Sequence, residues 1–284
     1  MTISNDFSFS QGSLQDYSDC RRRFQLRYLQ HLAWPAVESQ PALEAEHHMK
    51  QGQAFHRLVQ QHLTGLPPEK LAAMIHDDDL ETWWQNYLAF AQDPRGLGEF
   101  LQSDGLRFPE VGLSAPLASS RLTAKYDLVC AQPGGRMVIF DWKTYRKQPR
   151  HDWLAGHLQT RVYPYLLVKA GAQLNGGHPV DPEQVEMVYW RAGFPTALER
   201  FPYSPAQYQK HEAYLSGLVE EIAALPEESF YLTEKIDRCR FCVYRSLCER
   251  DVEPGDFGDL LFDTQAANQG GPMIDFEQIS EIEF

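Results

Sequence analysis

The sequence predicts an α/β fold in which a central mixed β-sheet is flanked by helices. Helical patterns fill the first third of the 284-residue chain, strand patterns bounded by turn residues fill the middle, and a helix follows each group of strands. The composition, 43% hydrophobic and 23% charged, is that of a globular protein with a sizeable core.

Three helical segments are predicted before the sheet. The first spans 13–30, with Ser13 as its N-cap and Cys20 in its interior. The second spans 43–63 and contains the sequence GQAFHRLVQQHL, and 69–102 form a further helical segment.

The first group of strands forms the centre of the predicted sheet. The Pro-Gly-Gly turn at 133–135 joins its last two members as a hairpin. The three strands are expected at 106–117, 121–131 and 136–142.

The second group of strands comes after a helix at 152–171. Strands are expected at 184–191 and 197–203, and the last predicted helix is 205–224.

The end of the chain differs in composition from the rest. Residues 249–284 hold ten acidic residues and one basic residue, so they contribute −9 of the net charge of −13. We expect a folded domain at 1–252, with the helical segment 66–104 inside it, and an acidic tail at 253–284. Large apolar residues alternate with carboxylates in its last part, MIDFEQISEIEF. This pattern favours docking of the tail on a protein partner, a second copy or a basic channel of the chain itself over an unimportant disordered end.

Charge and hydropathy limit the location and the partners. No segment approaches the ~20 apolar residues of a membrane span, and the N-terminus lacks the basic and apolar regions of a secretion signal. We therefore expect a cytoplasmic protein without a membrane partner. The negative net charge argues against nucleic acid, but basic runs at 20–27 and 143–151 are compatible with a local basic groove.

The stretch MVIFDWKTYRK places Asp141 and Lys143 two positions apart at a strand end. Side chains at i and i+2 of a strand share a face, so the carboxylate and the ammonium are neighbours. One interpretation is an exposed ion pair of little energetic value. The other is a metal-binding carboxylate beside a lysine that acts on a water molecule.

Further candidate ligands lie upstream of this strand. Pairing of the hairpin about residue 134 sets Asp127 opposite Asp141, where two carboxylates need a counter-ion such as Mg²⁺ or Mn²⁺. Glu110 and His56 are additional candidates, although each taken alone is as well explained as a solvated strand residue or an ordinary helix residue.

Gln159 and Tyr163 are four positions apart on the helix that follows Lys143, so they share a face that suits contacts to phosphate or substrate. Without that context Tyr163 reads as a core residue.

Cysteines are clustered near the end of the predicted domain. Cys239, Cys242 and Cys248 form a C-x2-C-x5-C pattern, which in a reducing compartment suggests a metal site before a disulfide. Cys20 lies 219 positions before this cluster, and Cys130, on the hairpin, is expected in the core.

These motifs, LTAKYDLV, VIFDWKT and LQTRVY with an upstream histidine and the terminal cysteines, resemble the PD-(D/E)XK nuclease superfamily. Within it the chain is similar to the RecB-type exonuclease branch, which includes the CRISPR adaptation exonucleases and the AddB nuclease domain. The resemblance implies a restriction-endonuclease-like fold. Its implied metal ligands are His56, Glu110, Asp127 and Asp141. Its implied catalytic lysine is Lys143, and its Q-x3-Y pair is Gln159 and Tyr163.

The resemblance also implies the chemistry of the two candidate sites. At the first, Asp127 and Asp141 share the metal and Lys143, expected to reach solvent, orients the attacking water, so that loss of Lys143 is expected to abolish cleavage with little effect on folding. At the second, Cys20 and the three C-terminal cysteines hold a [4Fe-4S] cluster that joins the two ends of the domain, with zinc as the alternative. The family commonly has Gly two residues before the first Asp. Lys125 stands there instead, which is expected to alter strand packing or to add a phosphate contact.

The resulting expectation is a metal-dependent DNA exonuclease, with or without endonuclease activity, that acts on single-stranded DNA or DNA ends in repair, recombination or CRISPR adaptation. Two alternatives remain open at this point. One is a non-catalytic iron-sulfur protein that binds nucleic acid or serves as an assembly subunit, and the other is a zinc-stabilised interaction protein whose tail recruits a partner.

Overall fold

The computed structural model describes most of the chain. The described residues are 3, 7–32, 40–144, 149–240 and 242–253, with the backbone alone at 40–46. All but the first residue of the predicted tail at 253–284 therefore lies outside the described residues. None of the described helices is both long enough and apolar enough to cross a membrane.

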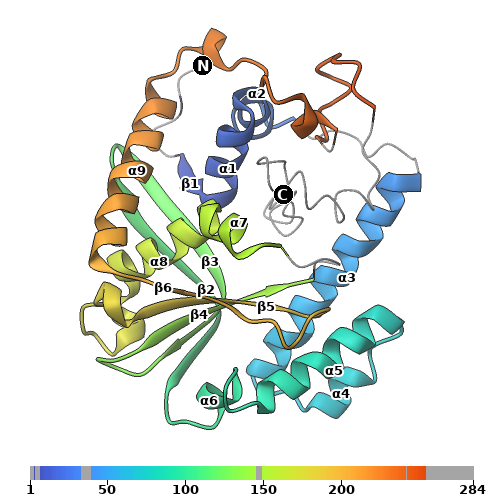
Figure 1. Cartoon of the computed structure of the whole chain (residues 1–284), viewed down its shortest axis with the longest axis vertical. Coiled ribbons are helices and arrows are strands. Elements are labelled where there is room, and N and C mark those ends of the chain that lie inside the picture. Colours follow the sequence, from blue (N-terminus) through green and yellow to red (C-terminus); the bar gives the residue numbers. More distant parts are fainter. Residues whose placement is uncertain (1–2, 4–6, 33–39, 145–148, 241, 254–284) are drawn as a thin grey trace.

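A six-stranded mixed sheet forms the centre of the fold (Figure 1), which confirms the predicted class. The order is β1-β3-β4-β5-β6, with β2 pairing on β3. The β1–β3 and β4–β5 pairs are parallel, and the other pairs are antiparallel. The strands are β1 (Ser8–Ser10), β2 (Leu106–Leu117), β3 (Ser120–Ala131), β4 (Met137–Lys143), β5 (Val185–Arg191) and β6 (Glu199–Pro202).

Helices cover both faces of this sheet, and each face has its own core (Figure 1). On one face, α1 (Gln11–Asp19), α8 (Leu158–Ala170) and α9 (Pro205–Ala224) pack on strand residues such as Ile139. On the other face, α3 (Gln40–Leu63) and α5 (Asp78–Gln92) pack on Phe140 and its neighbours. Because both faces are covered, every residue of β4 is buried.

Short elements complete the described chain. They are α2 (Arg21–Phe24), the π-helix η1 (Gln25–Leu29), α4 (Pro68–Ala72), α6 (Gly98–Leu101), α7 (His151–Gly156) and the 3-10 helices η2 (Gly171–Asn175), η3 (Pro182–Gln184), η4 (Glu227–Ser229) and η5 (Ile236–Cys239).

The first predicted helix, 13–30, is wrong in two respects. Cys20 has an extended backbone, φ −160° and ψ 112°, and separates α1 from α2. The N-cap is Ser10 instead of Ser13: the Ser10 side chain accepts from the Ser13 backbone N–H, and the Ser13 hydroxyl accepts from the Ser10 N–H. This reciprocal capping box starts α1 directly after β1, a strand too short to show an alternating pattern.

The other helix predictions hold with interruptions. The 152–171 helix is divided at His157, which has an extended backbone, and the 69–102 segment consists of three helices. The 205–224 helix is confirmed as α9.

Candidate active site and cysteine pocket

The candidate active site lies where β3 and β4 separate. Their pairing ends at Leu128 opposite Phe140, so extension of the register sets Asp127 opposite Asp141 as expected. At this position the Asp127 carboxylate, instead of a backbone carbonyl, accepts the Trp142 backbone N–H at 2.8 Å. A side chain thus satisfies the strand N–H and opens the space between the strands.

Glu110 on β2 lies beside this opening and has an unusual backbone. Its φ is +52°, in the left-handed region that a residue with a Cβ rarely adopts. The β2–β3 pairing skips Glu110 and Asp127 while the register continues on either side. Tyr126 and Val129, three positions apart, consequently face the same core. Simple alternation would put them on opposite faces, so the alternation of inward and outward side chains is offset by one residue at Glu110 and Asp127, while the pairing register is unchanged.

Three of the four predicted metal ligands meet here. His56 of α3, Glu110 of β2 and Asp127 of β3 each offer a ligand atom within 4.8 Å of the others, and none of the three is fully exposed. The His56 Nδ1 lies 3.4 Å from an Asp127 oxygen. Carboxylate oxygens with one imidazole are a donor set that fits Mg²⁺ or Mn²⁺, and two adjacent carboxylates are more stable with a cation between them.

Asp141 is not a member of this group of ligand atoms. Its Oδ2 is 3.0 Å from Lys143 Nζ, and its Oδ1 accepts a hydrogen bond from Gln159 Nε2 of α8 at 2.6 Å. The side chains of Asp141 and Lys143 are 3% and 2% exposed. The expectation that Lys143 reaches solvent is therefore wrong, because helices cover both faces of β4 at this point.

Tyr163 follows Gln159 by about one turn of α8 and is buried. Its ring packs on Tyr126, with centroids 4.8 Å apart, and its backbone carbonyl accepts the Tyr126 hydroxyl proton at 3.0 Å. Tyr163 thus fixes α8 to β3 next to the irregular position.

Two cations, Lys125 and Arg191, lie near the site, and the sequence predicted no firm role for either. Lys125 Nζ is 2.7 Å from Glu110 Oε2. Arg191 stands next to Lys143 on the parallel strand β5 and is 1% exposed. A guanidinium of Arg191 lies 3.7 Å from Glu199, which also contacts His151 at 2.8 Å. The sequence signal for Arg191 was only its place at a strand end.

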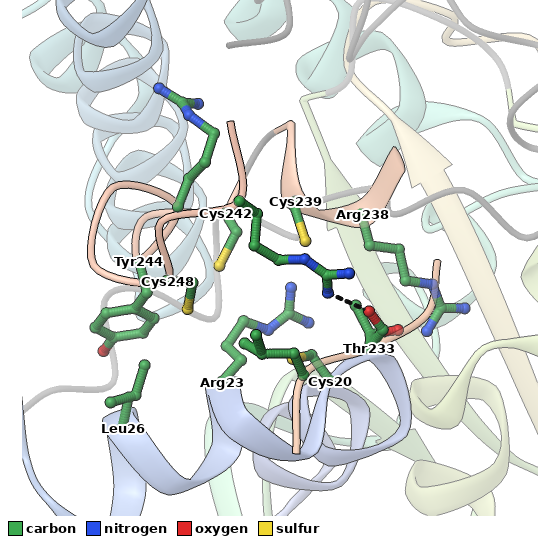
Figure 2. Close-up of a pocket in the computed structure, with 12 residues that line it drawn as sticks. Cys20, Arg23, Leu26, Thr233, Arg238, Cys239, Cys242, Tyr244 and Cys248 are labelled. Atoms are coloured by element: carbon green, nitrogen blue, oxygen red, sulfur yellow. Dashed lines mark hydrogen bonds between the residues drawn. The ribbon is translucent and has the colours of Figure 1, made fainter. Parts of the chain in front are cut away.

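The four predicted cluster ligands line one pocket. Cys20 comes from the extended link between α1 and α2, Cys239 is the last residue of η5, and Cys242 and Cys248 come from the turns after it. Figure 2 shows the cysteines around the pocket with the Arg23 guanidinium among them. Cys20 lines this pocket, and its extended backbone was not expected from the sequence. Thiols are the donors that iron-sulfur clusters and zinc prefer, but among the described residues these cysteines do not form a group whose ligand atoms all lie within 4.8 Å of one another.

Burial disfavours the thiolate form of three cysteines of this pocket, Cys239, Cys242 and Cys248. Burial raises the pKa of Cys242 to about 11, and burial also raises the pKa of Cys239 and Cys248. Ligand binding by these residues therefore requires release of protons to a metal. Cys130, by contrast, lies in the sheet core as predicted, where burial raises its pKa to about 12.

Charged groups around the pocket form a buried network. Arg23, 12% exposed, lies 2.8 Å from Asp16 and 2.7 Å from Asp19. Arg238 reaches back to Asp19 at 2.7 Å. Ion pairs thus hold α1 and η5 together beside the pocket.

A family model of PD-(D/E)XK nucleases matches residues 8–249. The chain belongs to the PD-(D/E)XK nuclease superfamily. This match covers both the strands of the candidate active site and all four pocket cysteines. It confirms the superfamily half of the resemblance and the mixed α/β fold.

A solved structure shares this fold, and a second one aligns less well. The crystal structure of a "Putative exonuclease" from Eubacterium rectale aligns with a TM-score of 0.52 and 11% identity, over 89% of this chain and 92% of that one. The structure of SSO0001 aligns with a TM-score of 0.35 and 13% identity, over 72% of this chain and 98% of that one. A search of curated proteins found no match.

Proposed function

We propose that the protein is a Mg²⁺- or Mn²⁺-dependent deoxyribonuclease that hydrolyses phosphodiester bonds, as an exonuclease on single-stranded DNA or DNA ends. The observation that carries the proposal is the meeting of His56, Glu110 and Asp127 within 4.8 Å at the opening between β3 and β4, one strand from the Asp141–Lys143 pair. Superfamily membership and the exonuclease name of a protein with the same fold support it.

The roles of the residues follow from their contacts. His56, Glu110, Asp127 and Asp141 would hold a divalent cation, which when bound polarises a phosphate and lowers the pKa of a bound water. Each oxygen of a carboxylate has two lone pairs, so Asp141 can accept from Gln159 and still serve as a ligand. Lys143 keeps its ammonium in one place because Asp141 binds it, and there it offsets negative charge that develops on the scissile phosphate. Tyr163 supports this arrangement from α8.

An end-labelled DNA assay tests the proposal. Purified, anaerobically handled protein is incubated with 5′- and 3′-labelled single and double strands in Mn²⁺, Mg²⁺ or EDTA, beside Asp127→Asn and Asp141→Ala variants. We expect shortening of the labelled strands that needs the metal and both carboxylates. DNA binding without cleavage in any metal would instead favour a non-catalytic subunit, and equal turnover by the variants would sink the assignment.

For the pocket we propose a [4Fe-4S] cluster held by Cys20, Cys239, Cys242 and Cys248. Support comes from the four side chains lining one pocket and from the arginines beside them, which offset the charge of four thiolates. We expect a brown protein with broad absorbance near ~400 nm that is lost on Cys20→Ser or Cys248→Ser substitution. A colourless protein with one zinc and no iron would replace this proposal with a zinc site.

The cytoplasmic location, the pathway and the tail also remain proposals. We take 253–284 as a docking segment for a protein partner, a second copy or the DNA channel of the chain itself. Truncation after Asp263 should leave the nuclease domain folded and either raise DNA affinity or change the oligomeric state. Salt-titrated DNA binding and light scattering measure these effects, and no change in either would make the tail dispensable.

A further inference from the structure

The outer face of the β2–β3 hairpin carries exposed residues beside the candidate metal site. Up to Lys125 the two strands alternate regularly, with Leu113, Leu122 and their neighbours buried and the intervening residues turned outward. Lys125 is on the outward face, and its partner across the strands is Gly112. A Cβ built on Gly112 would meet none of the atoms of the described residues within 4 Å, so none of them fills the space beside the Lys125 stem.

The Lys125 side chain extends from this exposed face to Glu110, a candidate metal ligand. Its Nζ lies 2.7 Å from Glu110 Oε2, and the two side chains are 59% and 17% exposed. The carboxylate is therefore fixed by its surroundings while the ammonium is mostly in water. An exposed ion pair of this kind contributes little to stability, so a second cation that binds Glu110 displaces Lys125 from that carboxylate at small cost.

Glu110 is held in position independently of Lys125. Its left-handed backbone, φ +52°, costs about 1–3 kcal/mol and persists because the paired strands on both sides fix it. A divalent cation at His56, Glu110 and Asp127 carries twice the charge of the lysine and binds the same carboxylate. The two cations thus compete for Glu110, and the lysine loses that competition when the metal concentration is sufficient.

We propose that Lys125 couples metal binding to DNA binding: it neutralises Glu110 in the metal-free protein and, once a divalent cation has taken that carboxylate, contacts a backbone phosphate of the DNA strand on the exposed face of the hairpin. This inference rests on the proposed function. Lys125 acts on the metal through Glu110, as a positioning residue, and it binds the DNA directly. It makes the protein bind DNA more strongly with metal than without, through the released ammonium.

Metal titration without DNA is the first test. Mn²⁺ binding is measured by calorimetry for the parent, Lys125→Gln, Lys125→Arg and Arg121→Gln. Arg121 is the matched control, because it is on the same exposed face but contacts Ser114 instead of a candidate ligand. Removal of the competing charge should tighten Mn²⁺ binding about threefold or more in Lys125→Gln, within the range of exposed ion pairs. Lys125→Arg and Arg121→Gln should stay close to the parent.

DNA binding is the second test. Fluorescence anisotropy with a labelled single strand is measured in EDTA and in Ca²⁺, over a series of salt concentrations, with gels to check that the strand stays intact. In Ca²⁺, Lys125→Gln should bind several-fold more weakly than the parent and its salt slope should fall by about 0.7, the loss of one phosphate contact to a single strand. In EDTA the variant and the parent should differ much less. Lys210→Gln, an exposed charge removal on α9, should match the parent in both conditions.

The results separate this inference from the proposed function. One outcome refutes the role of Lys125 and leaves the metal site standing: the parent binds Mn²⁺, Asp127→Asn abolishes that binding, and Lys125→Gln behaves like the parent in both tests. Equal tightening by Arg121→Gln also refutes it, because the effect would then be general electrostatics. No Mn²⁺ binding by the parent refutes both.

Discussion

Replacing Lys143 with methionine removes one half of a buried ion pair. Methionine keeps most of the apolar stem, so the change is mainly the loss of the ammonium 3.0 Å from Asp141. Asp141 is then left in a site where its side chain is 3% exposed, with the Gln159 amide still bound. Breaking a buried pair by removing one partner costs about 3–5 kcal/mol.

This cost should appear as a large loss of thermal stability. A domain of this size loses about 2–4 °C in Tm per kcal/mol, so we expect Lys143→Met to melt roughly 10 °C below the parent. The sequence-based expectation of intact folding is thus replaced, while loss of cleavage is still expected. Scanning calorimetry in EDTA measures the effect without a bound metal at the candidate active site.

An exposed pair of similar geometry provides the control. Lys169 Nζ lies 2.8 Å from Glu212, but the side chains are 37% and 40% exposed. Lys169→Met should therefore change the free energy of unfolding by less than about 1 kcal/mol. Lys143→Met with Asp141→Asn should be less destabilising than the sum of the two single changes, because the double variant leaves no buried charge of the pair. Equal, small effects at Lys143 and Lys169 would refute the reasoning from burial.

Three further predictions concern protonation and the carboxylates. Burial lowers the pKa of His211 to about 4, so between pH 6.5 and 4 the unfolded chain binds a proton that the folded protein excludes. The free energy of unfolding should therefore fall as pH drops from 6.5 toward 4. His211→Gln should flatten this part of the pH profile of urea unfolding. Burial raises the pKa of Cys242 from 9.0 to about 11, so between these pH values the unfolded chain loses a proton that the folded protein keeps. The free energy of unfolding of the metal-free protein should therefore fall as pH rises from 9.0 to 11, and it should fall less in Cys242→Ala. Asp127→Asn keeps an oxygen for the Trp142 N–H, so it should abolish Mn²⁺ binding in calorimetry while Tm in EDTA changes by only a few degrees.

The sheet could be predicted from the sequence because its signals are local. The turn at 133–135 and the β-branched segments around it fix a hairpin. The observed ends of β3 and β4 lie within one residue of the expected ends. The same hairpin arithmetic put Asp127 opposite Asp141. Three of the expected ligands meet, although they come from three different elements.

Other features depended on contacts that the sequence does not show. Cys20 is flanked by helix-forming residues, yet its backbone is extended where it meets the pocket formed with residues 239–248. The left-handed Glu110 has no glycine or asparagine to signal it. The burial of Lys143 follows from helices on both faces of β4, since a lysine at a strand end reads as exposed.

Each carboxylate of the candidate active site already has a local partner, and this has a consequence for folding. Asp141 pairs with a buried lysine, Glu110 with an exposed one, and Asp127 accepts a backbone N–H while lying beside His56. Like charges on adjacent strands would otherwise favour unfolding of this edge in the absence of metal. Because the protein supplies these counter-charges, the site can fold before a metal binds, and a divalent cation then stabilises the protein only by mass action on the folded state. The cysteine pocket differs, since Cys239, Cys242 and Cys248 must lose their protons to become ligands, and the metal or cluster proposed there would contribute to the folding of the domain itself.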